Sequence, residues 1–388
     1  MAKAESVDSG DELKIRANFL VGCDGGRSSV RSQLGAKLEG DAVIQRVQST
    51  YLDAPELIEL LSTEPAWGNL SLNPRRSGTV YAIDGRERWL IHNYLREDEA
   101  DFDSVDRDWA IRTILGVGED FEYRVISKED WYGRRLLADK FRSGRAFICG
   151  DSAHLWVPYA GYGMNAGIAD AENLGWLLAA RIQGWGAPGI LDAYEAERHP
   201  ITEQVSRFAM DHAHSTARQR RAVPADIEDE TTAGDRARRT LGQETYALNV
   251  QQYACAGLNF GYYYAESPII AYDAEPHLPY TMADYTPSTV PGSRTPHAWL
   301  GDGTSLYDNL GPGYTLIRLD RDLDVGSLAD ASSIRNVPLD VLDVEPTDVG
   351  DPYVTKLVLS RPDRHVAWRG NSLPSDVGAL VDLISGNH

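Results

Sequence analysis

Alternation of apolar and polar residues predicts an antiparallel β-sheet in the first third of the chain. The alternating runs are residues 43–52, 77–83 and 88–95, and residues 121–126 and 131–137 predict further strands. Turn-forming pairs at Asn73-Pro74 and Asp84-Gly85 separate the first three of them. Short alternating strands bounded by such pairs are typical of a sheet that packs one face on a core. Residues 103–115 predict a helix beside it.

A second pattern predicts buried strands and long helices. Residues 14–23 and 145–150 become apolar before a Gly-Asp or Asp-Gly pair, which is typical of strands entering a buried sheet. Residues 164–182 carry apolar side chains at helical spacing, namely Ile168, Ala171, Leu174, Leu178 and Ile182. Residues 191–214 predict another helix, and the charged residues 218–239 predict a solvated helix or a linker.

The last quarter of the chain predicts a separate compact unit. A stretch rich in turn-forming residues at 287–296 marks the boundary. Beyond it, four runs predict strands, at residues 314–319, 338–344, 353–360 and 365–370. Residues 377–384 predict a closing helix.

Composition narrows the class of protein. The chain of 388 residues is 42% hydrophobic and 25% charged, which fits a soluble globular protein of two or three domains. Its net charge of −20 argues against nucleic acid and anionic membranes as partners. Three scattered cysteines form no metal or disulfide pattern, and the N-terminus has no apolar segment, so we expect a cytoplasmic protein without a metal.

The first segment with candidate chemistry is VGCDGGRSSVR at residues 21–31. A buried strand would bring Asp24 to the carboxyl end of a sheet, where α/β proteins bind ligands. Gly25 would let a ligand approach the backbone, and Arg27 and Arg31 would face a phosphate or Asp24 itself. A strand–turn–helix junction with Asp24 as the helix cap explains the same residues equally well.

The second segment, residues 150–180, is more informative. A buried strand ends at Gly150-Asp151, and a loop with Pro158, Gly161 and Gly163 leads into the helix predicted from Met164. Asp151 would bind a polyol hydroxyl, while the bare helix N-terminus would stabilise an anion such as the edge of a reduced flavin. His154 lacks a partner at ligand spacing and is interpreted as a loop or packing residue.

These two segments resemble the Asp-Gly and Gly-Asp motifs of the single-component FAD-dependent aromatic hydroxylases, the family of p-hydroxybenzoate hydroxylase and phenol hydroxylase. Ser152 replaces the commoner Ala of the second motif. Residues 191–200 (LDAYEAERHP) resemble the helix that follows, and residues 291–300 and 359–368 resemble the thioredoxin-like C-terminal domain of the phenol hydroxylase branch, without its redox CxxC.

The resemblance implies a multidomain α/β and α+β fold. It comprises an incomplete Rossmann-like FAD-binding domain of the glutathione reductase type, an antiparallel-sheet substrate domain and a thioredoxin-like domain. The expected boundaries are residues 1–35 and 130–215 for FAD binding, 36–129 for the substrate sheet, 216–290 for a helical and aromatic connection, and 291–388 for the C-terminal domain.

The resemblance also implies residue roles. FAD would lie against Asp24, Gly25, Arg27, Gly150, Asp151, Pro158, Gly161, Gly163, Met164 and Asn165. NAD(P)H and O₂ would be co-substrates, a flavin C4a-hydroperoxide the oxidant, and a phenolic or polycyclic aromatic molecule the substrate. No catalytic base is identified, and His92, Tyr94, Tyr159 and Tyr162 are the candidates for contact with the substrate. The oligomeric state stays open, a homodimer included.

One family feature is missing. The glycine-rich G-x-G-x-x-G segment that binds the FAD pyrophosphate does not occur in this sequence. We expect a truncated chain of a hydroxylase; a natural remnant acting as an inactive binding or interaction module, or completion by another chain, are the alternatives. An epoxidase or oxidative decarboxylase of the same fold is a further hypothesis, because fold alone does not separate these chemistries.

Overall fold

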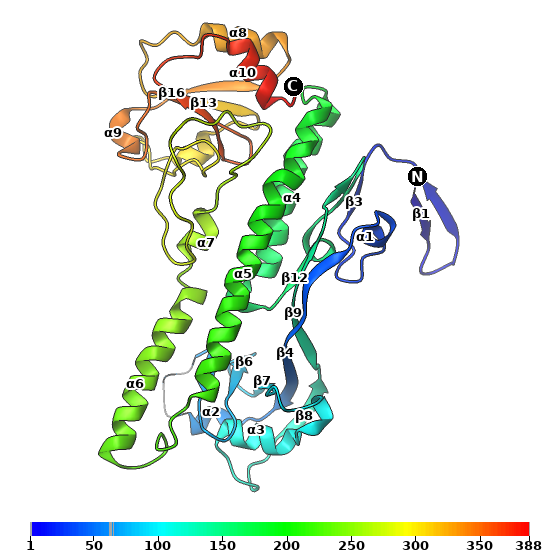
Figure 1. Ribbon diagram of the computed structural model, residues 1–388, viewed down its shortest axis with the longest axis vertical. Coiled ribbons are helices and arrows are strands. Elements are labelled where there is room, and N and C mark those ends of the chain that lie inside the picture. The colour runs from blue at the N-terminus through cyan, green and yellow to red at the C-terminus, as the bar shows by residue number, and fades with distance from the viewer. Residues whose placement is uncertain (1, 62–63, 65, 388) are drawn as a thin grey trace.

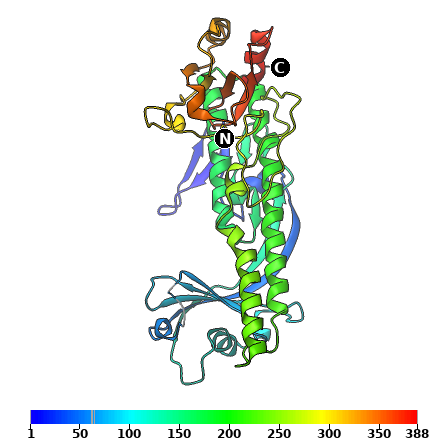
Figure 2. The same cartoon turned by 90° about the vertical axis from the view of Figure 1, so that its left-hand side faces the viewer.

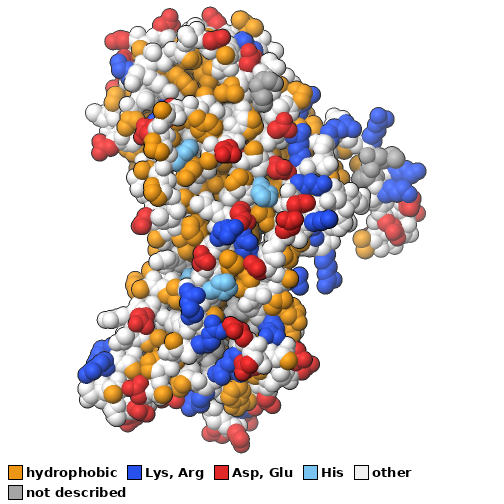
Figure 3. All heavy atoms as spheres, in the orientation of Figure 1, with side chains coloured by type: hydrophobic (Ala, Val, Ile, Leu, Met, Phe, Trp, Pro, Cys, Tyr) orange, Lys and Arg blue, Asp and Glu red, His pale blue; other side chains and the backbone are white. Residues whose placement is uncertain are grey.

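The computed structural model describes residues 2–61, 64 and 66–387. The molecule is elongated, with a large antiparallel sheet at one end and the C-terminal domain at the other (Figure 1). Two long helices, α4 (Tyr162–Gln183) and α5 (Ala193–Arg221), run between the two ends. Seen from the side, α5 lies next to α6 (Thr232–Asn249), and the middle of the molecule forms a narrower waist (Figures 2 and 3).

A small sheet holds the two strands that precede the predicted cofactor motifs. Its order is β10 (Arg142–Ser143), β11 (Ala146–Ile148) and β3 (Leu20–Gly22), and β11 and β3 are parallel. The strand predicted over residues 14–23 is two strands instead. Its first part, β2 (Glu12–Ile15), is exposed and forms a hairpin with β1 (Ala2–Glu5), so only β3 joins the buried pair.

The antiparallel sheet predicted from alternation is present and larger than expected. Its order is β12 (His154–Trp156), β9 (Trp131–Ala138), β4 (Leu38–Asp53), β7 (Arg88–Tyr94), β6 (Gly78–Ala82) and β5 (Gly68–Ser71), with β8 (Arg124–Lys128) also paired to β4. Strands β9 and β12 lie beyond residue 129, so this sheet continues into the segment expected to bind FAD. Helices α2 (Leu57–Leu60) and α3 (Arg107–Leu115) pack their apolar side chains on its core.

Helix α4 covers the predicted range and passes through the central core, but its buried face differs from the predicted one, because Ile168 and Ile182 are more than half exposed. Leu174 and Leu177 are fully buried there among Phe141, Phe147 and Tyr194. Helix α5 contains Pro200 and continues to Arg221, past the predicted end at residue 214. Helices α1 (Ser29–Gln33) and α7 (Ala256–Phe260) are short.

The C-terminal domain has a β-α-β unit followed by β-β-α. Its four-stranded sheet has the order β14 (Leu339–Asp343), β13 (Tyr314–Arg318), β15 (Leu357–Ser360) and β16 (Val366–Gly370), and only β13 and β14 are parallel. Helices α8 (Gly326–Ile334) and α10 (Val377–Ile384) pack on it, while α9 (Pro346–Val349) is a single turn. This topology is compatible with the expected thioredoxin-like domain. The multidomain α/β and α+β class is confirmed.

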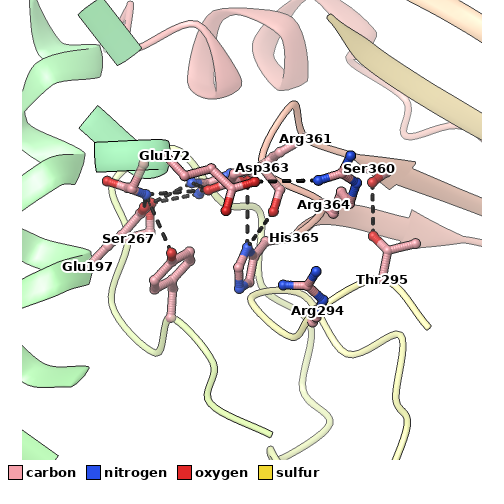
Figure 4. A network of polar contacts seen from close by, with 12 residues as sticks. Glu172, Glu197, Ser267, Arg294, Thr295, Ser360, Arg361, Asp363, Arg364 and His365 are labelled. Atoms are coloured by element: carbon pink, nitrogen blue, oxygen red, sulfur yellow. Dashed lines mark hydrogen bonds and ion pairs between the residues drawn. The ribbon is translucent and has the colours of Figure 1, made fainter. Parts of the chain in front are cut away.

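A buried ionic network fixes this domain to the long helices. Figure 4 shows the Arg361 guanidinium between two carboxylates, Glu197 of α5 and Asp363 of the C-terminal domain. Arg361 donates to both oxygens of Glu197, at 2.6 and 2.8 Å, and to Asp363 at 2.6 and 3.0 Å. Asn173 and Ser267 donate to the same glutamate. Because these groups are buried and mutually hydrogen-bonded, separating the domains would expose unpaired charges.

Candidate functional site: a glycine-rich loop beside an aromatic cavity

The structure brings the two predicted motifs together. Strands β3 and β11 are parallel, and their carboxyl ends place residues 24–26 next to the Gly150–Ser152 turn. Ser152 joins the two segments, because its hydroxyl accepts from Gly25 N at 3.0 Å and donates to Asp24 at 3.1 Å. A hydroxyl at this position therefore links both motifs, which an alanine would not do.

Asp24 uses its carboxylate on its own chain. It accepts from the backbone N–H of Ser29 at 2.7 Å and of Val30 at 3.1 Å, and from the hydroxyls of Ser28 and Ser29. Burial raises the pKa of Asp24, but these hydrogen bonds outweigh it and hold the pKa well below its usual value. The Asp24 carboxylate therefore binds the N-terminal backbone of α1, as the capping interpretation predicts.

The two arginines of the first motif differ. Arg31 is buried and donates to the carbonyls of Ser152 at 2.9 Å and of Gly26 at 2.8 Å, so it ties the motifs together. The expectation that Arg31 faces a phosphate or Asp24 is wrong, because its guanidinium donates hydrogen bonds to backbone carbonyls instead. Arg27 is exposed at the turn, where its side chain is available to a ligand.

Asp170 of α4 fixes the second motif from below. Its carboxylate accepts from Gly150 N at 3.2 Å, and it pairs with His154 Nε2 at 2.8 Å and with Arg198 Nε at 2.8 Å. Burial raises the pKa of Asp170, yet Arg198 and His154 lower it to about 2 overall. His154 is buried in this network, as its interpretation as a packing residue predicts, and Asp151 stands exposed at the turn.

The loop before α4 presents bare backbone. Ala160 and Gly161 both have left-handed conformations, with φ of 58° and 62°, and no side chain caps the helix N-terminus. A Cβ added at Gly161 or Gly163 would meet no atom within 4 Å, so the backbone there faces open space. Ala160 adopts a strained conformation, which proteins retain mainly at functional sites.

This loop fits the pyrimidine edge of a flavin. The unpaired N–H groups and the dipole of a 22-residue helix attract an electron-rich edge, and within the described residues the space next to Gly161 and Gly163 is open. Met164 is 74% exposed beside it. The Asn165 amide donates to Gly161 O at 2.8 Å, so it holds the loop in shape.

An aromatic cavity of about 250 Å³ adjoins the loop. Its lining residues come from the antiparallel sheet and its flanking turns, the loop and the turn after α6: Trp67, Tyr81, Ile83, Leu90, His92, Tyr94, Trp131, Pro158, Tyr159 and Gln252. A second cavity of about 140 Å³ shares four of them, Tyr81, Tyr94, Tyr159 and Gln252. Aromatic walls of this kind suit a flat apolar ligand.

The structure also sorts the four candidate substrate contacts. His92, Tyr94 and Tyr159 line the cavity, whereas Tyr162 is buried elsewhere and donates to Leu258 O at 2.6 Å. The His92 ring lies 5.2 Å from the Tyr81 ring and 5.8 Å from the Trp131 ring, both edge to face. Two further tyrosines, Tyr262 and Tyr264, belong to the same hydrophobic core as Tyr162.

Comparison with known proteins agrees with this geometry. The FAD binding domain family matches residues 1–209, more than half of the chain, and the C-terminal family of aromatic-ring hydroxylases matches residues 288–385. The chain belongs to the FAD-dependent aromatic hydroxylases. Its relatives include the FAD-dependent monooxygenase opdD of Penicillium oxalicum, which is 30% identical over 100% of this chain and 77% of the relative.

Two more similarities support the assignment to these hydroxylases. A putative polyketide hydroxylase of Streptomyces halstedii is 31% identical over 95% of this chain and 67% of its own. The structure of the rebeccamycin biosynthetic enzyme RebC with reduced flavin is 32% identical, with a TM-score of 0.87 over 99% of this chain and 71% of that chain.

Within the described residues of this hydroxylase, none of the helices combines the length and the apolar character that a membrane-spanning helix needs.

Sequence reasoning did not identify the roles of four residues that hold this site. Ser152 and Arg31 bind the motifs to each other, and Asp170 and Arg198 support the Gly150 turn. Asp170 and Arg198 sit on α4 and α5, 28 residues apart, and their pairing depends on how these helices pack. The one available signal was the presence of charged residues on otherwise apolar helix faces.

Burial makes the cavity histidine sensitive to acid. Desolvation lowers the pKa of His92 from 6.5 to about 4. Between pH 6.5 and about pH 4 the imidazole is therefore protonated in the unfolded chain while it stays neutral in the folded protein, and this difference favours unfolding. We therefore expect the free energy of unfolding to fall between pH 7 and pH 5, with His92 contributing about 2 kcal/mol of that loss. Urea unfolding of His92→Gln should show a correspondingly smaller loss. The same change at exposed His297 is the control, and an equal loss in both variants would refute the assignment.

Proposed function

We propose that the protein binds FAD along the loop before α4 and hydroxylates a phenolic or polycyclic aromatic molecule, with NAD(P)H and O₂ as co-substrates. One observation carries the proposal: Pro158 and Tyr159 belong both to the flavin loop and to the wall of the aromatic cavity. A ring in that cavity would therefore lie against the flavin. In the net reaction, one oxygen atom enters a ring C–H bond as hydroxyl, the other leaves as water, and NAD(P)H is oxidised.

Roles for the flavin contacts follow from their positions. Exposed Asp151 would bind the ribityl chain, while Gly161, Gly163 and Met164 would present backbone to the pyrimidine edge. Gly150 would keep the Gly150–Ser152 turn close to α4 through its hydrogen bond to Asp170, and Asn165 would hold Gly161 in place. Gly25 and Arg27 would face the cofactor from the first motif, with Asp24 shaping their turn. Bound flavin would supply the redox and oxygen chemistry.

The chain's own contribution is binding, orientation and exclusion of water. Aromatic walls would hold the substrate ring by stacking and edge contacts. The lowered pKa of His92 keeps its imidazole neutral near pH 7, so it would exchange a hydrogen bond with a substrate hydroxyl without adding charge. Burial raises the pKa of Tyr81 to about 12, so its phenol stays protonated and would act as a hydrogen-bond donor.

We also propose a division into functional units. Residues 1–35 and 130–215 would form the FAD-binding part, 36–129 the substrate sheet, 216–290 a connection and 291–388 the C-terminal domain. Supporting observations are the parallel β3–β11 pair and the separate core of the C-terminal domain. Strands β9 and β12 would then serve both of the first two units.

A steric substitution tests the cavity. Leu90→Trp should fill it, because Leu90 lies on its wall, and we expect affinity for 1,8-dihydroxyanthraquinone to fall at least tenfold while FAD binding is unchanged. Val125→Trp adds the same indole at an exposed position of β8 and is the matched control. Binding is measured by tryptophan fluorescence quenching, and hydroxylation by NAD(P)H oxidation with mass analysis of the product. Unaltered quinone binding and turnover in Leu90→Trp would contradict the proposed substrate site.

A further inference from the structure

Arg220 stands out among the residues around the aromatic cavities. It lies near the C-terminal end of α5 and lines the cavity of about 140 Å³ that shares Tyr81, Tyr94, Tyr159 and Gln252 with the larger one. Its guanidinium carbon is 3.9 Å from the centre of the Tyr94 ring. This contact uses one face of the guanidinium and leaves its five N–H donors, which lie in the plane, for other partners.

Those donors have no acceptor from the described part of this chain. Neither a hydrogen bond nor an ion pair joins Arg220 to another described residue. Its neighbours differ, since Arg221 pairs with Glu97 at 2.5 Å and Arg76 pairs with Glu99 at 2.5 Å. Arg220 also lines a third cavity, of about 90 Å³, where the carboxylate of Glu97 is already paired with Arg221.

The walls of the two aromatic cavities themselves carry no negative charge. Among the described residues that line the two cavities there is no aspartate or glutamate, and Arg220 is the one with a permanent charge. The remaining polar groups are hydroxyls, amides and the neutral His92. A ligand that fills both cavities would therefore meet an apolar, aromatic surface with a single fixed positive charge.

We propose that Arg220 is a specificity-determining residue that binds a negatively charged oxygen substituent, a carboxylate or an ionised hydroxyl, on the aromatic substrate. The inference rests on the proposed function, because it assigns a substituent to the substrate of the same site. Arg220 lines the smaller cavity, whereas Pro158 lines only the larger one, so an ion pair with Arg220 would hold the anionic end of the substrate in the smaller cavity and leave another ring for the larger one. Guanidinium groups suit this role because they donate two parallel hydrogen bonds to a carboxylate.

Two probes that differ in charge test the proposal. Anthraquinone-2-carboxylate and anthraquinone-2-carboxamide share shape and ring system, and quenching of tryptophan fluorescence, with Trp67 and Trp131 in the cavity wall, reports their binding. We expect the carboxylate to bind the unaltered protein at least tenfold more tightly than the carboxamide. Arg220→Gln should abolish that preference without weakening carboxamide binding, and Arg220→Lys should restore most of it.

The controls separate this role from a structural one. Arg218→Gln removes an exposed arginine of the same helix and should leave the ratio of the two affinities unchanged. If both probes bind equally to the unaltered protein, or if Arg220→Gln keeps the preference, Arg220 has no such role although the cavity still binds aromatics. If neither probe binds the unaltered protein, the aromatic site of the proposed function is itself refuted, and the role of Arg220 with it.

Discussion

Replacement of Asp170 by asparagine is expected to lower the free energy of unfolding by about 3–5 kcal/mol and to abolish stable FAD binding. The Asp170 carboxylate is fully buried and is the ion-pair partner of Arg198, so the amide would leave a buried cation uncompensated. The same carboxylate holds Gly150 N, and its loss would release the turn that presents Asp151. Urea unfolding and gel filtration with FAD measure the two effects.

An exposed ion pair provides the control for Asp170. Asp192 also pairs with an arginine, Arg142, but its side chain is 63% exposed, so Asp192→Asn should change stability by less than about 1 kcal/mol and leave FAD binding intact. The contribution of Asp170 should be present above about pH 4 and lost as the pH falls toward 2, because its native pKa lies below the unfolded value of 3.8. An Asp170→Asn protein as stable and as yellow as Asp192→Asn would disprove the role of this carboxylate.

The second large effect is expected at the boundary between the long helices and the C-terminal domain. Arg361→Met would leave Glu197 and Asp363 buried without their cation, and we expect a loss of about 3–5 kcal/mol. The C-terminal domain should then separate more readily, so limited proteolysis within residues 287–296 should become faster. Glu197→Gln should have a smaller effect, because Arg361 would keep Asp363 as a charged partner.

A neighbouring arginine gives a matched comparison for Arg361. Arg364 reaches Glu172 of α4 at 3.4 Å, and both side chains are more than a third exposed. Arg364→Met should therefore change stability by less than about 1 kcal/mol and should not alter the rate of proteolysis. Equal effects of the two substitutions would show that burial of the Arg361 network does not hold the domains together.

Local patterns predicted the elements whose side chains face one core. The apolar spacing of residues 164–182 predicted α4, which runs from Tyr162 to Gln183, and residues 377–384 predicted α10 with its observed bounds. The alternating runs at residues 77–83 and 88–95 likewise became β6 and β7. In β7 and α10 the buried side chains follow the expected period, whereas Ile168 and Ile182, which contributed to the spacing for α4, are exposed.

Other features depended on partners distant in the sequence. By composition, residues 14–23 could form one strand. In the structure their first part belongs to β2, which pairs with β1, and their last part is β3, which pairs with β11. The last turns of α5 are charged, and their helical state follows from packing beside the sheet and α6 instead of from apolar spacing. Arg31, Asp170 and Arg361 each have one partner that lies 28 to 164 residues away, and no local pattern predicts these distant partners.

The visible absorption spectrum of the purified protein with FAD, before and after addition of 1,8-dihydroxyanthraquinone, tests most directly whether flavin and aromatic ligand share one site. After gel filtration we expect retained flavin bands near ~375 and ~450 nm, and a change in the flavin band when the quinone binds, because Pro158 and Tyr159 line both sites. The change should be absent in Leu90→Trp. A protein that keeps no FAD, or a flavin spectrum indifferent to an aromatic that demonstrably binds, would contradict the proposed arrangement.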